Sequence, residues 1–490
     1  MSLPVPAAIP QVLIDAPLAR EAGSLQRQLH DRLKRLILAG SLAPGSWLPG
    51  SRALADALSI SRNTVTGVYE LLAAEGYVQC DRQGTCVAAL SRPVTLRRAG
   101  SKPLAPAIAA RLSNIGLAVP RVDGTGAFRP GVPALSKFPA ADWRRAIDLA
   151  IRQAGREGLG YGDPLGAPPL RQAIARHLGL SRGVRCTPDQ VVITEGAQEA
   201  LALCATLLTN PGDTAWIEDP GYRGAKAAMH AADLRIVPQR VDADGLCTTD
   251  ADWMAHPPRL VYTTPSHQYP AGAVLTVQRR LALIHQAAKH GAWLIEDDYD
   301  SEFRHAGESI AAMQGLVDQA PVLYLGTFSK TMFPSLRVGF LVLPEVLMAP
   351  LARPLNELLR GGHLHEQLAL AAFIDSGKFG RHLGRMRRLY RDRQRALRNA
   401  LTRHFSVPHA IEGGHSGLHL LVRLPPRFPD AQIVEAASRH GLSPAPLSSY
   451  ALQPRPQDNG LVLGYGDTPV ELYEPLVRRL SQLARAADAQ

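Results

Sequence analysis

The chain has 490 residues and a mass of 52.8 kDa, and this length indicates more than one domain. Hydrophobic residues make up 46% and charged residues 20%, which excludes a largely disordered chain, while the net charge of +11 favours a polyanionic partner. No apolar run can cross a membrane, no leader pattern opens the sequence and the five cysteines are scattered, so we expect a cytoplasmic protein without disulfides or a metal site.

The first 90 residues predict a small helical unit that ends in a hairpin. Leucines at helical spacing predict a helix over residues 24–39. Ser51 and Ser61 are suited to cap two further helices, the second of which covers residues 62–75. Apolar residues on both sides of a turn at 81–84 predict a short hairpin. The expected unit, residues 20–90, is therefore a helix, a helix-turn-helix and a wing.

Such an order of elements is typical of DNA-binding domains. The second helix of a helix-turn-helix enters the major groove with its first turn. Here Arg62 can pair with guanine and Asn63 with adenine. For one isolated helix, an ordinary exposed surface with no ligand is the better explanation of such residues, and the ordered set of elements shifts the balance toward DNA binding. The predicted DNA contacts are Arg52, Ser61, Arg62, Asn63, Thr64, Arg82 and Gly84.

Residues 91–121 have the composition of a linker. They are rich in proline and alanine, and they carry six basic residues and no carboxylate. Residues 1–90 have a net charge of only +1, so most of the positive charge near the N-terminus lies in this segment. It can attract DNA phosphates, although a simple soluble tether has the same composition.

From residue 122 onward, short apolar runs alternate with helical segments. Continuous apolar runs between helices are typical of parallel strands buried on both faces. We therefore expect an α/β domain over residues 122–490, with a large lobe at about 140–350 and a smaller α+β lobe at about 351–490. The predicted strands of the large lobe are residues 191–194, 214–217, 260–263, 293–296, 322–325 and 338–343, and those of the small lobe are 417–424 and 461–464.

Polar residues at the ends of these strands fit the needs of a cofactor aldehyde. Such a cofactor requires an amine, an anion at its pyridine nitrogen, a donor to its ring oxygen, an aromatic face and a phosphate cup. Lys330 can supply the amine. A period of 2 along residues 293–300 places Asp297 and Tyr299 on one face of their strand and Glu296, Asp298 and Asp300 on the other. An acidic metal site is less favoured, because no histidine stands at ligand spacing.

Other residues of the large lobe can complete this set. A glycine that opens a helix after the strand at 191–194 lets backbone N–H groups converge on a phosphate. An arginine can bind a phosphate through two hydrogen bonds, and a tyrosine can stack on the ring. The candidates are Gly196, Ala197 and Gln198 at the helix, Thr327 and Arg337 near the lysine, and Tyr222 after a further strand.

Two parts of the sequence resemble known families. The stretch LPGSRALADALSISRNTVTGVYELLAAEGYV resembles the winged helix-turn-helix of the GntR family of bacterial regulators. The region from about Phe128 onward is similar to fold type I aminotransferases in its motifs YGDPLG, EGAQEAL, EDPGY, TPSHQYPAG, EDDYDSEFR and GTFSKTMFPSLRVGF. With the two parts in this order, the chain resembles the MocR/GabR subfamily of GntR-type regulators.

The resemblance implies pyridoxal 5'-phosphate as the cofactor, bound to Lys330 as a Schiff base. It implies Asp297 at the pyridine nitrogen, Tyr299 at the ring oxygen, Tyr222 against the ring and His267 nearby. Gln198, Thr327 and Arg337 are implied on the phosphate side, together with the turn at Gly196 and Ala197.

On this basis we expect a homodimeric regulator that binds double-stranded operator DNA. It senses pyridoxal phosphate, or an amine or amino acid that forms an aldimine with it at Lys330. The alternative is a working aminotransferase with an accessory DNA-binding domain. One departure bears on the choice. Aminotransferases commonly grip the substrate carboxylate with an arginine of a C-terminal strand, and the corresponding residues 460–466 contain none.

Overall fold

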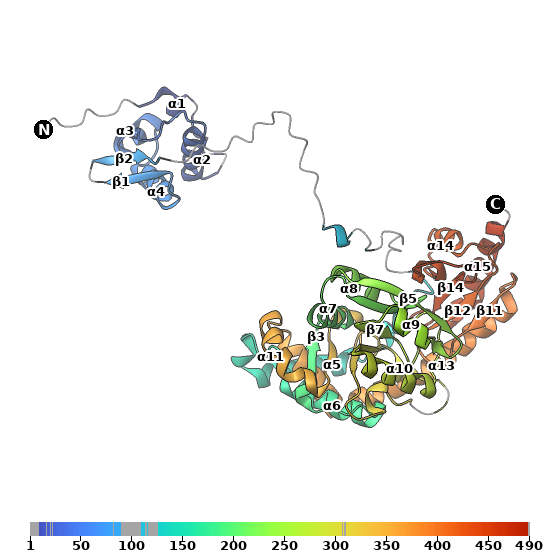
Figure 1. Cartoon of the computed structure of the whole chain (residues 1–490). Helices are drawn as coiled ribbons and strands as arrows, with labels where there is room; N and C mark the ends of the chain where they lie inside the picture. The colour runs from blue at the N-terminus through green and yellow to red at the C-terminus, as the bar shows by residue number, and fades with distance from the viewer. Residues whose placement is uncertain are drawn as a thin grey trace. The chain divides into compact units, whose positions relative to one another are not determined.

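The chain forms two compact units, residues 1–107 and 108–490 (Figure 1). The computed structural model describes residues 9–15, 17–19, 21, 23–81, 83–89, 109–112, 115, 126–305, 307 and 310–488. Most of the expected linker and Arg82 lie outside these ranges. Within them, no helix has both the length and the apolar character needed to cross a membrane.

The N-terminal unit is a helical bundle with a two-stranded wing. Helix α4 packs against α2 and α3 around a core that includes Leu29, Leu33, Leu54 and Val68. Its elements are α1 (Gln11–Ile14), α2 (Leu25–Leu38), α3 (Ser51–Leu58), α4 (Arg62–Ala74), β1 (Val78–Asp81) and β2 (Gly84–Val87). The two strands pair antiparallel, as the hairpin pattern predicts.

The two predicted helix caps differ in outcome. The Ser61 side chain accepts a hydrogen bond from the Asn63 backbone N–H at 3.2 Å and caps α4. The prediction for Ser51 is wrong, because Gly50 is the N-cap of α3 and Ser51 is already its first helical residue. The Ser51 hydroxyl instead accepts a hydrogen bond from the Arg62 Nε at 3.4 Å.

A mixed eight-stranded sheet forms the centre of the C-terminal unit. Its order is β3-β10-β9-β8-β7-β4-β5-β6. The strands are β3 (Val191–Thr194), β4 (Thr214–Asp219), β5 (Arg235–Asp242), β6 (Gly245–Leu246), β7 (Leu260–Thr263), β8 (Trp293–Asp298), β9 (Val322–Thr327) and β10 (Gly339–Val342). Strands β4, β7, β8 and β9 are parallel, as predicted, and so is β5, which was not among the strands predicted from the sequence.

Strand β10 differs from the prediction, because it runs antiparallel to both β9 and β3. The reason is its connection to β9, which covers only residues 328–338. A parallel crossover usually needs a dozen or more residues and a helix. This short connection carries Lys330.

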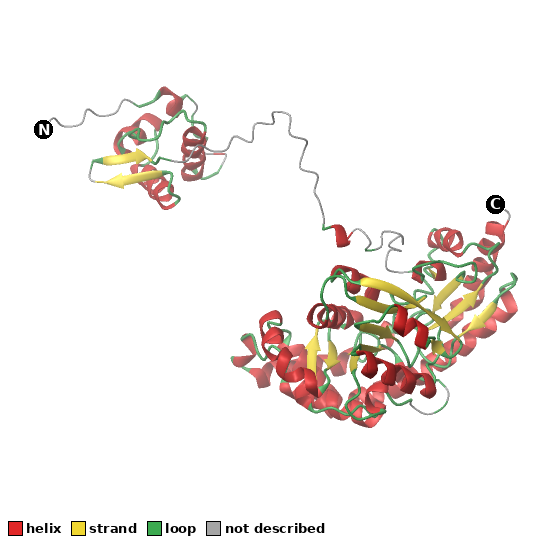
Figure 2. Ribbon diagram, viewed as in Figure 1, coloured by secondary structure: helices red, strands yellow, loops and turns green. Residues whose placement is uncertain are grey.

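Helices cover both faces of the sheet (Figure 2). Alternate residues of β4 belong to different cores: Ile217 packs with α7 and α8, whereas Trp216 packs with α10 on the other face. The helices of this lobe are α5 (Ala140–Ala154), α6 (Pro168–Arg182), α7 (Ala197–Leu208), α8 (Arg223–Ala231), α9 (Asp250–Ala255), α10 (Val277–His290), α11 (Glu345–Leu358) and α12 (Leu364–Asp375).

A smaller lobe follows the long helix α13 (Lys378–His404). Its sheet has the order β11-β12-β14-β13. The remaining elements are β11 (Ala410–Glu412), β12 (His419–Arg423), α14 (Asp430–Ser438), β13 (Ala445–Pro446), β14 (Gly460–Gly464) and α15 (Tyr473–Asp488). The segment at the start of the unit joins this lobe, since the Phe128 backbone N–H donates to the Thr468 hydroxyl and the ring is buried.

Candidate functional site

A cavity of about 340 Å³ lies at the carboxyl ends of strands β4, β8 and β9, where parallel α/β sheets place their ligands. Residues of the small lobe, Leu418 and His419, also line it. Among the predicted cofactor residues, Ala197, Gln198, Tyr222, Asp297, Tyr299, Thr327, Lys330 and Arg337 line this cavity. Gly196 and His267 do not line it, and both lie directly beside residues that do.

Asp297 lines this cavity and has one carboxylate oxygen without a partner among the described residues. Its Oδ2 accepts a hydrogen bond from the Tyr262 hydroxyl at 2.7 Å. Its Oδ1 is buried and has no hydrogen-bond partner among the described residues. Burial raises the pKa of Asp297 to about 7, and the Tyr262 hydrogen bond opposes this rise. A protonated ring nitrogen at Oδ1 would supply both the missing donor and a compensating positive charge.

Lys330 lies in the same cavity as a buried amine. Its Nζ donates a hydrogen bond to the Gly131 carbonyl at 2.7 Å. Burial lowers the pKa of Lys330, while the nearby Asp300 and Asp297 carboxylates act in the opposite direction. A lowered pKa increases the fraction of neutral amine, which is the form that attacks an aldehyde.

The phosphate side of the cavity is built around the N-terminus of α7. Gly196 precedes the helix with a φ of 89°, a conformation that favours glycine, and a β-carbon there would lie 3.3 Å from an Arg337 guanidinium nitrogen. Arg337 donates to the Glu195 carbonyl. The helix N-terminus and the guanidinium therefore converge on one side of the cavity, where an anion is favoured.

Ser329 extends this polar side and is absent from the predicted set. Ser329 lines the cavity. Its backbone N–H donates a hydrogen bond to the Thr327 hydroxyl at 3.2 Å, and the Thr327 hydroxyl donates to the Ser329 hydroxyl at 3.0 Å. Its position directly before Lys330 in the sequence is the signal that could have identified it.

Besides Tyr299, three tyrosines supply an aromatic lining. The predicted Tyr222 precedes α8 and meets Tyr269 edge to face, with ring centroids 6.1 Å apart. Tyr262 and Tyr269 also line the cavity and were not predicted, since their strand and loop read as an apolar run and a proline turn. Gln198 donates to the Gly224 carbonyl at 2.9 Å and thereby fixes the start of α8 beside Tyr222.

Asp300 lies on a different side from the one that the alternation predicts. Asp297 and Tyr299 do share a side, as expected, but Asp300 also lines the cavity. Strand β8 ends at Asp298, and Asp300 has φ −149° and ψ 14°, so the alternation stops before it. Its carboxylate lies 3.1 Å from the His267 Nδ1.

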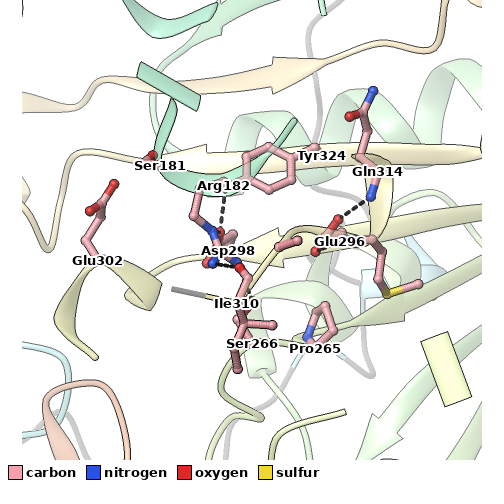
Figure 3. Close-up of polar contacts among 12 residues, drawn as sticks. Ser181, Arg182, Pro265, Ser266, Glu296, Asp298, Glu302, Ile310, Gln314 and Tyr324 are labelled. Atoms are coloured by element: carbon pink, nitrogen blue, oxygen red, sulfur yellow. Dashed lines mark hydrogen bonds and ion pairs between the residues drawn. The ribbon is translucent and has the colours of Figure 1, made fainter. Parts of the chain in front are cut away.

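A buried ion pair supports the strand end from the other face of the sheet (Figure 3). The Arg182 Nε donates to the Asp298 Oδ2 at 2.8 Å, and its Nη2 donates to the Ser266 hydroxyl at 2.6 Å. The Tyr324 hydroxyl donates to the same Asp298 oxygen. Because Ser266 directly precedes His267, this network fixes both the loop and the strand that carry cavity residues.

On the N-terminal unit, the first turn of α4 presents its side chains to solvent. Arg62 and Asn63 are exposed and Thr64 is half-buried, while Arg52 is exposed on α3. In the wing, Gly84 has a φ of 146°, and its N–H donates to the Asp81 carboxylate at 3.0 Å. The described part of the predicted DNA-contact set is therefore available on the surface of one unit.

Comparison with known proteins gives a match for each unit. Residues 25–87 match the family "Bacterial regulatory proteins, gntR family", and residues 132–440 match "Aminotransferase class I and II". The chain is 39% identical over 446 residues to the probable rhizopine catabolism regulatory protein MocR of Rhizobium meliloti, covering 90% of each chain. It is 32% identical over 463 residues to the pyridoxine biosynthesis transcriptional regulator PdxR of Corynebacterium glutamicum, covering 93% of this chain and 95% of that one.

A solved structure is similar to the C-terminal unit. It is LysN, the alpha-aminoadipate aminotransferase of Thermus thermophilus, complexed with N-(5'-phosphopyridoxyl)-L-leucine. The similarity has a TM-score of 0.67 and a sequence identity of 26%, and it covers 78% of this chain and 96% of LysN.

Proposed function

Because this chain belongs to the MocR/GabR subfamily of GntR-type transcriptional regulators, we propose that it controls transcription in response to pyridoxal phosphate bound at Lys330. Asp297 lines the same cavity as Lys330. The observation that carries the proposal is that its buried Oδ1 has no hydrogen-bond partner among the described residues. A pyridine N–H is the group that this oxygen fits.

Pyridoxal phosphate supplies an aldehyde that condenses with amines and a ring that accepts electrons. In this proposal Lys330 provides the amine, Asp297 holds the proton on the ring nitrogen and Tyr299 donates to the ring oxygen. The phosphate is held by the N-terminus of α7 together with Thr327, Ser329 and Arg337, and Tyr222 covers the ring. The fit is chemical: each residue offers the group that the corresponding part of the cofactor needs.

We favour pyridoxal phosphate itself as the effector over an amino acid. Among the described residues that line the cavity, the strands of the small lobe and their approach supply Leu418 and His419, and no arginine that could bind the carboxylate of an amino acid. Burial lowers the pKa of His419 to about 3, so this histidine is neutral at physiological pH. The name of the relative PdxR, a regulator of pyridoxine biosynthesis, is consistent with this choice.

A working aminotransferase remains the second candidate, and the intact Lys330 together with the similarity to LysN favours it. Steady turnover of an amino donor and a keto acid at ordinary enzyme rates, about 1–1000 per second, would select it. A regulator would instead show single half-reactions or none.

The decisive experiment is DNA footprinting on the promoter beside the gene, with and without pyridoxal phosphate. We expect the cofactor to change the footprint of the wild-type protein and to leave that of Lys330→Ala unchanged. Visible absorption of the bound cofactor should be present in the wild type and lost in Lys330→Ala. A wild-type footprint that does not respond to the cofactor would exclude the proposed sensing.

We further propose that the protein acts as a homodimer, so that two N-terminal units bind one operator. Paired DNA-binding heads match the two-fold symmetry of a palindromic site. Sedimentation of the full chain with and without cofactor measures this state directly.

A further inference from the structure

His267 and Asp300 form a buried pair directly beside Tyr299. Their side chains are 1% and 2% exposed, and the His267 Nδ1 lies 3.1 Å from both carboxylate oxygens of Asp300. The same nitrogen lies 3.0 Å from the Tyr299 hydroxyl, which also donates to the His267 backbone carbonyl at 3.0 Å. The Tyr299 hydroxyl is thus in contact with both the ring and the backbone of one residue.

The surroundings of His267 determine where its proton lies. The Nε2 is buried and has no hydrogen-bond partner among the described residues. A protonated Nε2 would be a buried donor without an acceptor, and leaving such a donor unpaired costs free energy. An unprotonated Nε2 without a partner has a smaller desolvation cost. A proton on Nδ1 is shared between the Asp300 carboxylate at 3.1 Å and the Tyr299 oxygen at 3.0 Å. Asp300 therefore selects the form of His267 that donates toward the hydroxyl.

The small lobe closes over this pair. A β-carbon at Gly417 would lie 2.2 Å from His267 and 2.4 Å from Asp300, so only a glycine lets the backbone approach this closely. The His419 ring of β12 lies 4.9 Å from the His267 ring, measured between centroids. The pair is consequently held between the sheet of the large lobe and the start of strand β12 in the small lobe.

We propose that His267, held by Asp300, is a positioning residue that directs the Tyr299 hydroxyl to the ring oxygen of the bound cofactor. This inference rests on the proposed function of the cavity. With Nδ1–H donating to the Tyr299 oxygen, the hydroxyl proton is free to turn from the His267 carbonyl to a better acceptor. The hydrogen bond from His267 polarises the Tyr299 hydroxyl and strengthens the hydrogen bond that this hydroxyl donates. The negative charge on the ring oxygen would thereby be stabilised.

Several other charged or titratable groups face this pair or the adjoining Tyr299 and remain unchanged in the test. They come from every element packed against it: Asp297 and Asp298 of β8, Glu218 of β4, Tyr269 of the same loop as His267, His305 after β8, Lys330 after β9, His419 of β12 and Tyr465 after β14.

The test measures the pH at which the visible absorption of the bound cofactor changes. His267→Leu and His267→Gln remove the donor at the Nδ1 position, whereas His267→Asn keeps an amide N–H close to it. We expect the midpoint to rise by about 1 pH unit in the Leu and Gln variants, since one hydrogen bond to a charged group is lost. In the Asn variant, we expect the midpoint to lie within a few tenths of a pH unit of the wild-type value.

A double-mutant cycle separates positioning from a merely structural effect. Tyr299→Phe should raise the midpoint by itself, and adding His267→Leu to it should produce no further shift. Additive shifts, or an unchanged midpoint in His267→Leu beside a shifted Tyr299→Phe, would overturn the inference. If His267→Leu does not fold, His267→Gln replaces it in the cycle.

Two further outcomes are distinguishable. Polar atoms of His267, Asp300 and His419 lie within 4.8 Å of one another, a spacing that could also hold a metal ion. A midpoint that moves when the wild type is treated with a chelator would therefore overturn the hydrogen-bond role. A wild type without visible absorption would contradict the proposed function itself, before the role of His267 is tested.

Discussion

At Asp297, the raised pKa connects cofactor binding to stability. The folded value of about 7 lies above the usual value of 3.8, so the folded protein binds more protons than the unfolded chain between these two pH values. The resulting stabilisation is complete below pH 3.8 and is lost as the pH rises through 7. In the absence of cofactor, we expect Asp297 by itself to lower the free energy of unfolding by roughly 1–3 kcal/mol between about pH 5 and about pH 8.

Chemical denaturation at both pH values measures this difference. Asp297→Asn should make this decrease smaller by roughly 1–3 kcal/mol, because an amide does not titrate. Glu296, whose pKa burial also raises to about 7, keeps its own contribution. Asp189→Asn, a change at a carboxylate whose side chain is 88% exposed, is the matched control and should keep the full decrease. An equal decrease in Asp297→Asn and in the wild type would contradict the assignment.

Individual site residues were predictable where a local rule applied. Strand alternation placed Asp297 and Tyr299 on one side, and it failed at Asp300, because β8 had already ended. Tyr262 was not predictable in the same way. It reaches Asp297 from the neighbouring strand β7, and only the register between the two strands brings the hydroxyl to the carboxylate.

At the scale of elements, helix α4 carries the predicted DNA contact that can be tested most directly. Its first turn exposes Arg62 at a capped N-terminus. An arginine that pairs with guanine through two hydrogen bonds contributes about 1–3 kcal/mol of discrimination. Arg62→Ala should therefore weaken operator binding about 5- to 150-fold and leave the visible absorption of the cofactor unchanged.

A DNA titration with the operator and a scrambled duplex checks this expectation. Arg27→Ala changes an exposed arginine of α2 outside the predicted contact set and serves as the control. Equal affinity of Arg62→Ala and the wild type for the operator would remove α4 from the recognition role.

The elements themselves were largely predictable, because helical spacing and apolar runs report local structure and burial. The direction of β10 was not, since an apolar run reports burial and does not report orientation. The buried network of Arg182 and Asp298 was hidden for a similar reason: its partners come from α6 and β8, which are far apart in the sequence. A lone arginine at the end of a helix is ordinarily a solvated group.

For the whole molecule, the distribution of charge suggests that DNA affinity depends on more than the N-terminal unit. Residues 91–121 have a net charge of +6, against +1 for residues 1–90. One of these cations, Arg111, donates to the Ala231 carbonyl at the end of α8 and so belongs structurally to the C-terminal unit. Its neighbours Arg97 and Arg98 lie outside the described residues.

Replacing both Arg97 and Arg98 by glutamine should reduce the salt dependence of DNA binding. Each phosphate contact contributes about −0.9 to the slope of log K against log salt concentration, so we expect the slope to become smaller by up to about 1.8. Substituting Arg395 and Arg403, exposed on α13, changes the net charge equally and should leave the slope unchanged. An unchanged slope in the Arg97 and Arg98 variant would show that the linker is only a tether.

The Lys330 Nζ donates a hydrogen bond to the Gly131 carbonyl, and the same nitrogen is the one proposed to bond to the cofactor. The two roles exclude each other. While the amine is free, it ties down the segment that leads into the C-terminal unit. Under the proposed function, that nitrogen is joined to the cofactor, and the Gly131 carbonyl then loses this donor. Cofactor binding would thus remove one of the hydrogen bonds that hold residues 126–139, while those of Phe128 and Ala134 stay in place.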